Sequence, residues 1–399
     1  MMSNSLIAMR RWDVPVAVTL TLALQMGIST INASTPVLAP AIAADRGWNV
    51  TLIALYPIAV YGTAFFFSFQ IPALLSRIGG MGLGIASLAA SAIGILFLLS
   101  TSPLLMSVAV LSLGFAVGAM NPASAQILGP RISSRNAGLI MSIKSTGIPL
   151  GVMLAGAIVP VLISWSSWQY AVLDLAAVAT VMSMALLPSV RWFNQHDVRS
   201  PPAKTQRMLD PIRRLAAIPG MARFLIAASV FAATRDCLRT FYVVYLVNHA
   251  GLTLVVAGLA LSASQAAGVV GQVIWATASD RLLSTSITMA VVGTLITVGI
   301  ALTATITTGW SLTWIVAVAA LYGISAGGFF PLVLAEIARR CTDGDAGPLT
   351  AAAQIFMIPI TLVGPLLFGV VASVTNFSAA FAVLAGSTLI ATIVVGRGK

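Results

Sequence analysis

The apolar sequence GFAVGAMNP at residues 114–122 returns later in the chain as GISAGGFFP at residues 323–331. A second match follows in the same order, because Ile-Pro stands at 148–149 and again at 358–359, at nearly the same separation. Two matches in register indicate that the chain contains a duplicated unit. Internal repeats of this kind are typical of transporters whose substrate site lies at the interface between the two copies.

The composition around these repeats is that of a membrane protein. Of the 399 residues, 59% are hydrophobic and only 8% are charged, and the mean hydropathy is +1.00. The net charge of +11 would suggest a nucleic-acid partner in a soluble protein, but here the basic residues fall in short loops between apolar segments. The two cysteines, Cys237 and Cys341, have no metal-ligand spacing. We therefore expect a bilayer-embedded protein with no nucleic acid, metal or cofactor, and no enzymatic activity.

Segments of about 20 apolar residues are long enough to cross the hydrocarbon core of a bilayer. Twelve such segments can be placed on the chain, so the sequence predicts an all-α membrane protein with twelve transmembrane helices. The predicted spans are 14–35, 51–75, 82–101, 104–128, 137–160, 168–188, 220–247, 252–277, 286–306, 311–335, 347–371 and 378–396.

One long polar connection divides these spans into six and six. It covers residues 189–219 and contains Pro201-Pro202 and most of the clustered charge. Together with the internal repeat, this connection predicts two pseudo-symmetric six-helix bundles. The expected domains are an N-terminal bundle at 1–188, a cytoplasmic loop at 189–219 and a C-terminal bundle at 220–399.

The distribution of lysine and arginine predicts the orientation. Nearly all loop cations fall on one side of the predicted spans, and the other side has only Arg46. Because cytoplasmic loops are enriched in Lys and Arg, we expect both termini to be cytoplasmic. The protein is then a multi-pass protein of the inner or plasma membrane, and we expect a monomer.

Three charges interrupt the apolar segment 221–247, at Arg235, Asp236 and Arg239. A charge at the centre of a membrane helix costs about 2.5–3.5 kcal/mol on insertion scales, so it normally faces protein or a water-filled path. The two arginines are four residues apart and share one helical face. A guanidinium matches a carboxylate with two parallel hydrogen bonds. We predict that both arginines bind a small anionic substrate; alternatively, Asp236 only forms a structural ion pair with Arg239.

Other polar residues inside spans are candidate ligands for the same substrate. Lys144 lies in the fifth span, and alignment of the repeats sets it opposite Gln354 in the eleventh; alternatively, its amine extends toward the cytoplasm. Tyr242 follows the two arginines on their helix. Gln25 and Gln265 lie within the first and eighth spans, where they could equally form ordinary interhelical hydrogen bonds.

The coupling residues are harder to assign. Anion uptake against a negative interior costs about 2.3 kcal/mol per charge per 100 mV, so symport with protons or anion exchange is expected. Asp236 stands beside two arginines, which favour its ionised form and argue against a free proton carrier. Asp174 in the sixth span is more isolated, and it could instead pair locally.

The twelve-span plan with two related halves resembles the major facilitator superfamily over essentially the whole chain. That family has the pattern Gly-x-x-x-Asp-Arg-x-Gly-Arg between its second and third helices, a loop that is thought to latch the halves. Here the first position is Pro72 and the acid is replaced by Ser76, followed by Arg77. The second half keeps the acidic pair as Asp280-Arg281. The resemblance implies gating roles for Arg77, Asp280 and Arg281, with Asp280 as the better latch.

The fifth-span sequence KSTGIPLG at 144–151 resembles bacterial permeases of the cyanate and small organic anion group. In the superfamily the first, fourth, seventh and tenth helices line a central cavity. The resemblance therefore implies that Arg235 and Arg239 lie on a cavity helix.

These observations predict a secondary active transporter that moves a small organic anion, such as a carboxylate, by alternating access. The alternative is a proton-coupled exporter of drugs or other lipophilic or cationic compounds. Such exporters usually have an acid in the cavity helices of the first half, and the first five predicted spans contain neither Asp nor Glu. A signalling or intramembrane enzyme would need a cytoplasmic domain or a catalytic constellation, and the sequence has neither.

Overall fold

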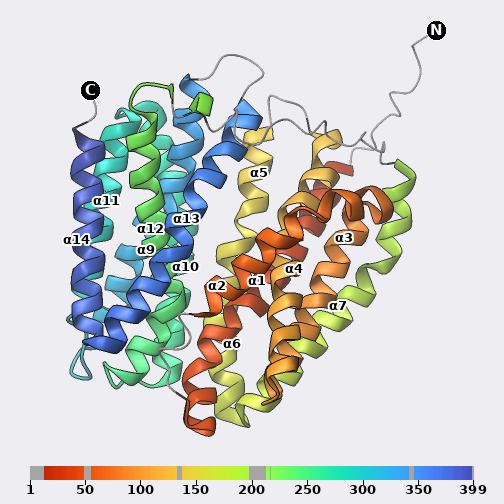
Figure 1. The fold of residues 1–399 in the computed structure, drawn as a ribbon, viewed down its shortest axis with the longest axis horizontal. Helices are drawn as coiled ribbons and strands as arrows, with labels where there is room; N and C mark the ends of the chain where they lie inside the picture. The colour runs from red at the N-terminus through yellow and green to blue at the C-terminus, as the bar shows by residue number, and fades with distance from the viewer. Residues whose placement is uncertain are drawn as a thin grey trace. The chain divides into compact units, whose positions relative to one another are not determined.

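The computed structural model describes residues 13–48, 55–132, 137–196, 213–215, 217–340 and 346–397. All regular structure in these residues is helical, which confirms the all-α prediction (Figure 1). The main helices are α1 (Asp13–Arg46), α2 (Leu55–Ser68), α3 (Ile71–Leu96), α4 (Pro103–Leu128), α5 (Ala137–Ser145), α6 (Gly147–Trp165), α7 (Trp168–His196), α9 (Met221–Asn248), α10 (Leu254–Arg281), α11 (Thr285–Thr303), α12 (Leu312–Arg340), α13 (Ala346–Val374) and α14 (Phe377–Gly396).

Ten of the described helical segments are long and apolar enough to cross a membrane. The described part of α2 is shorter, with an apolar stretch at Ile58–Ser68. Helix α9 has the required length but contains Arg235, Asp236 and Arg239. The seventh predicted span therefore differs from the others in its charge and not in its length.

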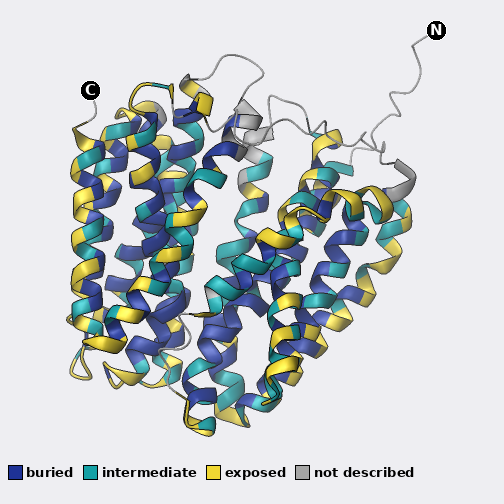
Figure 2. Cartoon of the chain, in the orientation of Figure 1, coloured by how far each residue is buried: buried dark blue, intermediate teal, exposed yellow. Residues whose placement is uncertain are grey.

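The outward faces of the helices are apolar. Val374, Val383 and Ile390 are 79%, 60% and 65% exposed, and Figure 2 shows that exposed positions run along the sides of the helices as well as at their ends. Exposed apolar side chains over the length of a helix are expected where lipid replaces water. Serine and threonine hydroxyls inside the helices donate to the carbonyl one turn earlier, as Ser87 does to Leu83 at 2.7 Å.

The chain divides into two compact units. The first, unit 1, contains Met1–Thr35, Ala59–Val152 and Leu162–Ala203, and the second, unit 2, contains Pro36–Ile58, Met153–Val161 and Lys204–Lys399.

In unit 1, glycines bring α4 against α2. A Cβ atom added at Gly114 would lie 2.8 Å from the carbonyl oxygen of Val60, and one at Gly118 would lie 2.9 Å from that of Ala64. Only glycine leaves room for backbones this close, as the paired small residues predict.

Unit 2 has the matching contact between α12 and α10. A Cβ at Gly323 would lie 1.9 Å from the carbonyl oxygen of Ser264, and one at Gly327 would lie 2.2 Å from that of Gly268. The repeated sequence at 114–122 and 323–331 thus performs the same packing task in each unit.

The helices with the second repeated sequence, α6 and α13, pack on α1 and α9, through glycines that stand two and five residues after the Ile-Pro pair. Gly151, just after Ile-Pro in α6, lies against α1, since an added Cβ would be 2.5 Å from the carbonyl oxygen of Met26. Gly364 in α13 lies against Ala233 of α9, with 2.7 Å between the added Cβ and the alanine Cβ. These pairs support the duplication that the sequence indicates.

Several helix boundaries differ from the predicted spans. Helix α1 continues past residue 35 to Arg46, with Pro36 and Pro40 inside it, whereas the first span was predicted to end before these prolines. In membrane helices neighbouring groups can satisfy the backbone that a proline leaves unpaired, so proline is a weaker stop signal there. The second predicted span is interrupted by a turn at Phe69 and Gln70, between α2 and α3, and Gly79 within α3 is also non-helical, with φ 74° and ψ 169°.

The fifth predicted span is divided into two helices. Helix α5 ends at Ser145 and α6 begins at Gly147. Pro149 explains the break, because a proline ring clashes with the carbonyl of the residue four positions earlier, here Ser145. Lys144 therefore lies in the last turn of α5, next to an interruption of the span.

Candidate functional site

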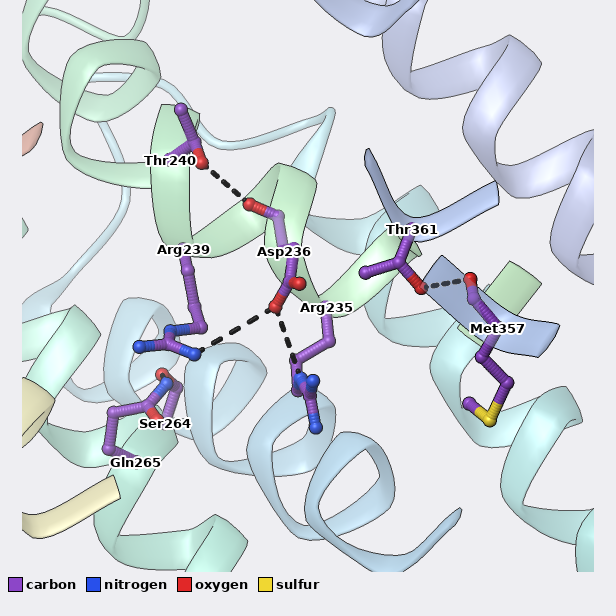
Figure 3. Close-up of polar contacts among 8 residues, drawn as sticks. All are labelled: Arg235, Asp236, Arg239, Thr240, Ser264, Gln265, Met357 and Thr361. Atoms are coloured by element: carbon purple, nitrogen blue, oxygen red, sulfur yellow. Dashed lines mark hydrogen bonds and ion pairs between the residues drawn. The ribbon is translucent and has the colours of Figure 1, made fainter. Parts of the chain in front are cut away.

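The centre of the candidate site is a cluster of three charges on α9. The Nε atom of Arg235 lies 3.3 Å from Oδ1 of Asp236, and Nη1 of Arg239 lies 3.8 Å from the same oxygen. Figure 3 shows both guanidinium groups approaching this one carboxylate. The side chain of Asp236 is 10% exposed, against 35% for Arg235 and 18% for Arg239. The cluster therefore has two cations for one partly enclosed anion.

Neighbouring residues contact the backbone of the acid and the side chain of one arginine. Thr240 donates its hydroxyl to the backbone carbonyl of Asp236 at 2.8 Å. The guanidinium carbon of Arg235 lies 5.1 Å from the ring centre of Phe329 on α12, within cation–π range. Arg235 is thus the more firmly fixed of the two arginines, because it has both a hydrogen bond and a ring contact.

Arg239 is held less firmly. Its 3.8 Å approach to Asp236 is too long for a hydrogen bond, and no described residue accepts a hydrogen bond from its guanidinium. The ion pair between Asp236 and Arg239 that the structural alternative expects is present, and Arg235 makes the closer contact with the same carboxylate. The donors of Arg239 that no described residue accepts are suited to bind a ligand.

A cavity lies next to Arg239. It is a small, partly open hollow between α9, α10 and α12, and its lining is formed by Leu238, Arg239, Tyr242, Leu261, Ser264, Gln265 and Tyr322. Figure 3 shows Arg239 extending toward Ser264 and Gln265. Three predicted ligands, Arg239, Tyr242 and Gln265, therefore meet at one cavity within unit 2. Arg235 is not among its lining residues.

Two lining residues, Ser264 and Tyr322, are absent from the predicted set. Ser264 donates to the carbonyl oxygen of Leu261 at 2.7 Å and accepts from Nε2 of Gln265 at 3.3 Å. Tyr322 directly precedes Gly323 of the repeated sequence and packs on Gly299 of α11. Because adjacent helical residues point in different directions, the repeated sequence did not indicate that Tyr322 lines the cavity.

Lys144 occupies a separate position in unit 1. It is 4% exposed, and its amine donates to Oδ1 of Asn121 on α4 at 2.8 Å. Among the described residues no carboxylate pairs with it. The amine therefore points at a neutral amide and does not extend to the helix end.

Gln25 is fully buried on α1, and neither its amide nitrogen nor its amide oxygen has a hydrogen-bond partner in the described chain.

The remaining candidates are exposed or only partly described. Gln354 on α13 and Asp174 on α7 are exposed, as are Arg77 and Arg281. The side chain of Asp280, the predicted latch, lies outside the described part of the structure.

A different arginine, Arg339, connects α12 with the neighbouring ends of α10 and α11 in unit 2. Arg339 on α12 donates to the carbonyl oxygen of Ser279 at 2.7 Å and also to the hydroxyl of Thr285 on α11. It therefore ties α12 to the turn between α10 and α11. The sequence did not single out this contact.

Metal binding receives no support from the described residues, which contain no cluster of three or more His, Cys, Asp or Glu side chains that could hold an ion. Cys237 is buried on α9 as a free thiol.

A scan against protein-family models matches the Major Facilitator Superfamily at residues 18–358 and 224–397. The two matches together extend over nearly the whole described chain. A search of curated proteins finds no match. The family match agrees with the all-helical structure and with the spans along the chain.

Proposed function

Because the chain belongs to the Major Facilitator Superfamily, a family of multi-pass secondary transporters and not of enzymes, we propose that it transports a small organic anion. A carboxylate is the favoured chemical class, and alternating access is the mechanism that the fold implies. One observation carries the proposal: two guanidinium groups on a membrane helix share a single carboxylate, and Arg239 lies beside a cavity with no other acceptor among the described residues.

The charge of the cluster favours an anion over a cation. Arg235, Asp236 and Arg239 sum to one net positive charge, and an ion in a poorly solvated setting is stabilised by an opposite charge. An anionic ligand would supply the second negative charge that the cluster lacks. A cationic ligand would add to the imbalance.

Lys144 in unit 1 also favours a negatively charged substrate. It is a buried cation whose only described hydrogen-bond partner is a neutral amide. Gln25, Gln354, Tyr242 and Gln265 complete the proposed set of polar ligands. Asp236 is proposed to balance the arginines, and Asp174 remains a candidate for coupling. Transport is proposed to use protons or exchange for a second anion, since a membrane potential opposes anion entry.

The exporter of drugs or other lipophilic or cationic compounds is the second candidate. The cavity in unit 2 disfavours it because the lining of this cavity contains an arginine and no acid.

The placement of the chain in its membrane is part of the proposal. The excess of Lys and Arg on one side of the spans supports an inner-membrane or plasma-membrane protein with both termini in the cytoplasm. The equivalent glycine contacts support two homologous bundles, at 1–188 and 220–399, joined by the cytoplasmic segment 189–219. Arg77, Asp280 and Arg281 are proposed to act at the loops that latch the bundles.

The proposed function is tested by replacing each arginine of the cluster with alanine. We expect the Arg235→Ala and Arg239→Ala variants to bind the transported anion at least tenfold more weakly, because a hydrogen bond to a charged group contributes about 1.5–3 kcal/mol. Purified protein is first screened by thermal shift against mono- and dicarboxylates, inorganic oxyanions and cationic dyes. The stabilising anion is then titrated against each variant.

The matched control is Arg223→Ala, because Arg223 is an exposed arginine at the start of the same helix. It should bind the anion like the wild type. Stabilisation by cationic dyes alone would refute the anion proposal in favour of the exporter.

Lys144→Gln tests the contribution of unit 1. The amide keeps a donor for Asn121 but removes the charge, so we expect the half-saturating anion concentration for uptake into proteoliposomes to rise about tenfold. Arg191→Gln removes an exposed cation from α7 and serves as the control. Unchanged uptake kinetics in the Lys144→Gln variant would assign Lys144 a purely structural role.

A further inference from the structure

We propose that the hydroxyl groups of Tyr242 and Tyr322, together with the guanidinium of Arg239, form the binding site for a small oxyanion in unit 2. Tyr322 is then a substrate-binding residue that the sequence did not indicate. The inference rests on the proposed function, because it assigns ligand contacts to the transported anion. It goes further by naming the groups that donate hydrogen bonds to the ligand.

Tyr242 and Tyr322 are both buried with a hydroxyl group that makes no hydrogen bond to a described residue. Tyr242 and Tyr322 are 3% and 4% exposed, and the hydroxyl of each is buried without a hydrogen-bond partner among the described residues. Leaving a buried hydroxyl unsatisfied costs about 1–3 kcal/mol, and phenylalanine would fill the same space without that cost. Both tyrosines belong to the lining of one cavity, and their unpartnered hydroxyls are accounted for if a ligand accepts hydrogen bonds from them.

The donors come from two helices and border one cavity. Tyr242 lies on α9, one turn beyond Arg239, and Tyr322 lies on α12. The guanidinium of Arg239 is likewise without a hydrogen-bond acceptor in the described chain. A ligand that satisfies all three groups must carry negative charge and several acceptor oxygen atoms. A carboxylate or an inorganic oxyanion meets both requirements.

The other side of the cavity limits the ligand. Leu238 and Leu261 provide apolar lining, and Gln265 provides an amide that already donates to Ser264. Arg239 is the only charged residue in this lining, so the geometry favours a ligand that presents one carboxylate group or one small inorganic oxyanion.

The test removes one hydroxyl at a time. Full-length Tyr242→Phe and Tyr322→Phe variants in lipid nanodiscs are titrated with acetate, lactate, succinate, phosphate and nitrate, and binding is followed by thermal stabilisation. We expect each variant to bind the preferred anion about ten- to a hundredfold more weakly, which corresponds to one lost hydrogen bond to a charged acceptor. In proteoliposomes the half-saturating concentration should rise by the same factor, while uptake at saturating anion should change little.

Tyr245→Phe is the matched control. Tyr245 lies on the same helix and is also buried with an unpartnered hydroxyl, but it does not line the cavity. Its variant should bind the anion like the wild type. An equal loss of affinity in Tyr245→Phe would overturn the inference, because the effect would not depend on the cavity.

The outcomes separate the inference from the function on which it rests. If the anion stabilises the wild type, Arg239→Ala weakens binding, and both cavity tyrosine variants bind normally, the inference is overturned while anion transport stands. If no anion of the panel stabilises the wild type, the proposed function fails and the inference fails with it. A preference for acetate or lactate over succinate would identify the short carboxylate, and a preference for phosphate or nitrate would identify the inorganic ion.

Discussion

Asp236→Asn is expected to lower the free energy of unfolding by about 3 kcal/mol. Removal of one partner from a buried ion pair costs roughly 3–5 kcal/mol, because an unpaired charge remains in a poorly solvated place. Asp236 is the only described acid within ion-pair distance of Arg235 and Arg239, so its loss leaves two cations side by side. The lower end of the range applies because Arg235 is 35% exposed and is partly screened by solvent.

The measurement is thermal unfolding of the purified variant in detergent, with and without the stabilising anion. The anion should restore more stability to Asp236→Asn than it adds to the wild type, because it supplies the missing negative charge. Asp174→Asn is the control, since Asp174 is exposed on α7 and its loss should change the unfolding temperature little. An Asp236→Asn variant as stable as the wild type would show that the arginines are solvated well enough to need no counter-charge.

Gly323→Ala is expected to have the second largest effect, a loss of about 3 kcal/mol. The added methyl group would lie 1.9 Å from the carbonyl oxygen of Ser264, and a backbone oxygen cannot turn aside as a side chain can. Overpacking of this kind typically costs 1–3 kcal/mol, and here the two helices would have to separate. Because Ser264 and Tyr322 line the cavity, the variant should also bind the anion more weakly.

Gly386→Ala provides the matched control for this substitution. Gly386 lies in α14, and nothing is within 4 Å of its added Cβ. Alanine there should leave the stability unchanged or raise it by about 0.5–1 kcal/mol, since alanine favours a helix over glycine. Thermal unfolding of both variants checks the prediction. Equal stability of the two would mean that α10 and α12 can move apart without cost.

The sequence predicted the features that depend on composition and spacing. Helical spans follow from the length of the apolar segments, and the glycine contacts follow from paired small residues such as Gly323 and Gly327. Arg235, Asp236 and Arg239 could be found because charge within a membrane helix is rare and expensive. Each of these signals is local in the chain.

Other features depend on tertiary geometry and could not be predicted in the same way. Whether Tyr322 or Ser264 faces the cavity depends on the rotation of α12 and α10 about their axes, which the glycine contacts determine. The closer contact of Asp236 with Arg235 than with Arg239 depends on side-chain rotamers. The burial of Lys144 against Asn121 depends on the distance between α5 and α4, and helical spacing does not give that distance.

The glycine contact between α10 and α12 has a consequence for the way in which a ligand leaves. The backbones of α10 and α12 are in contact at Gly268 and Gly327, with no side chains between them at that point. We therefore expect the two helices to move as one rigid body. Ser264 and Tyr322 belong to this helix pair, so the distance between them should stay constant during the transport cycle. Release of the anion would then require α9, which contains Arg239, to slide or tilt away from α10 and α12.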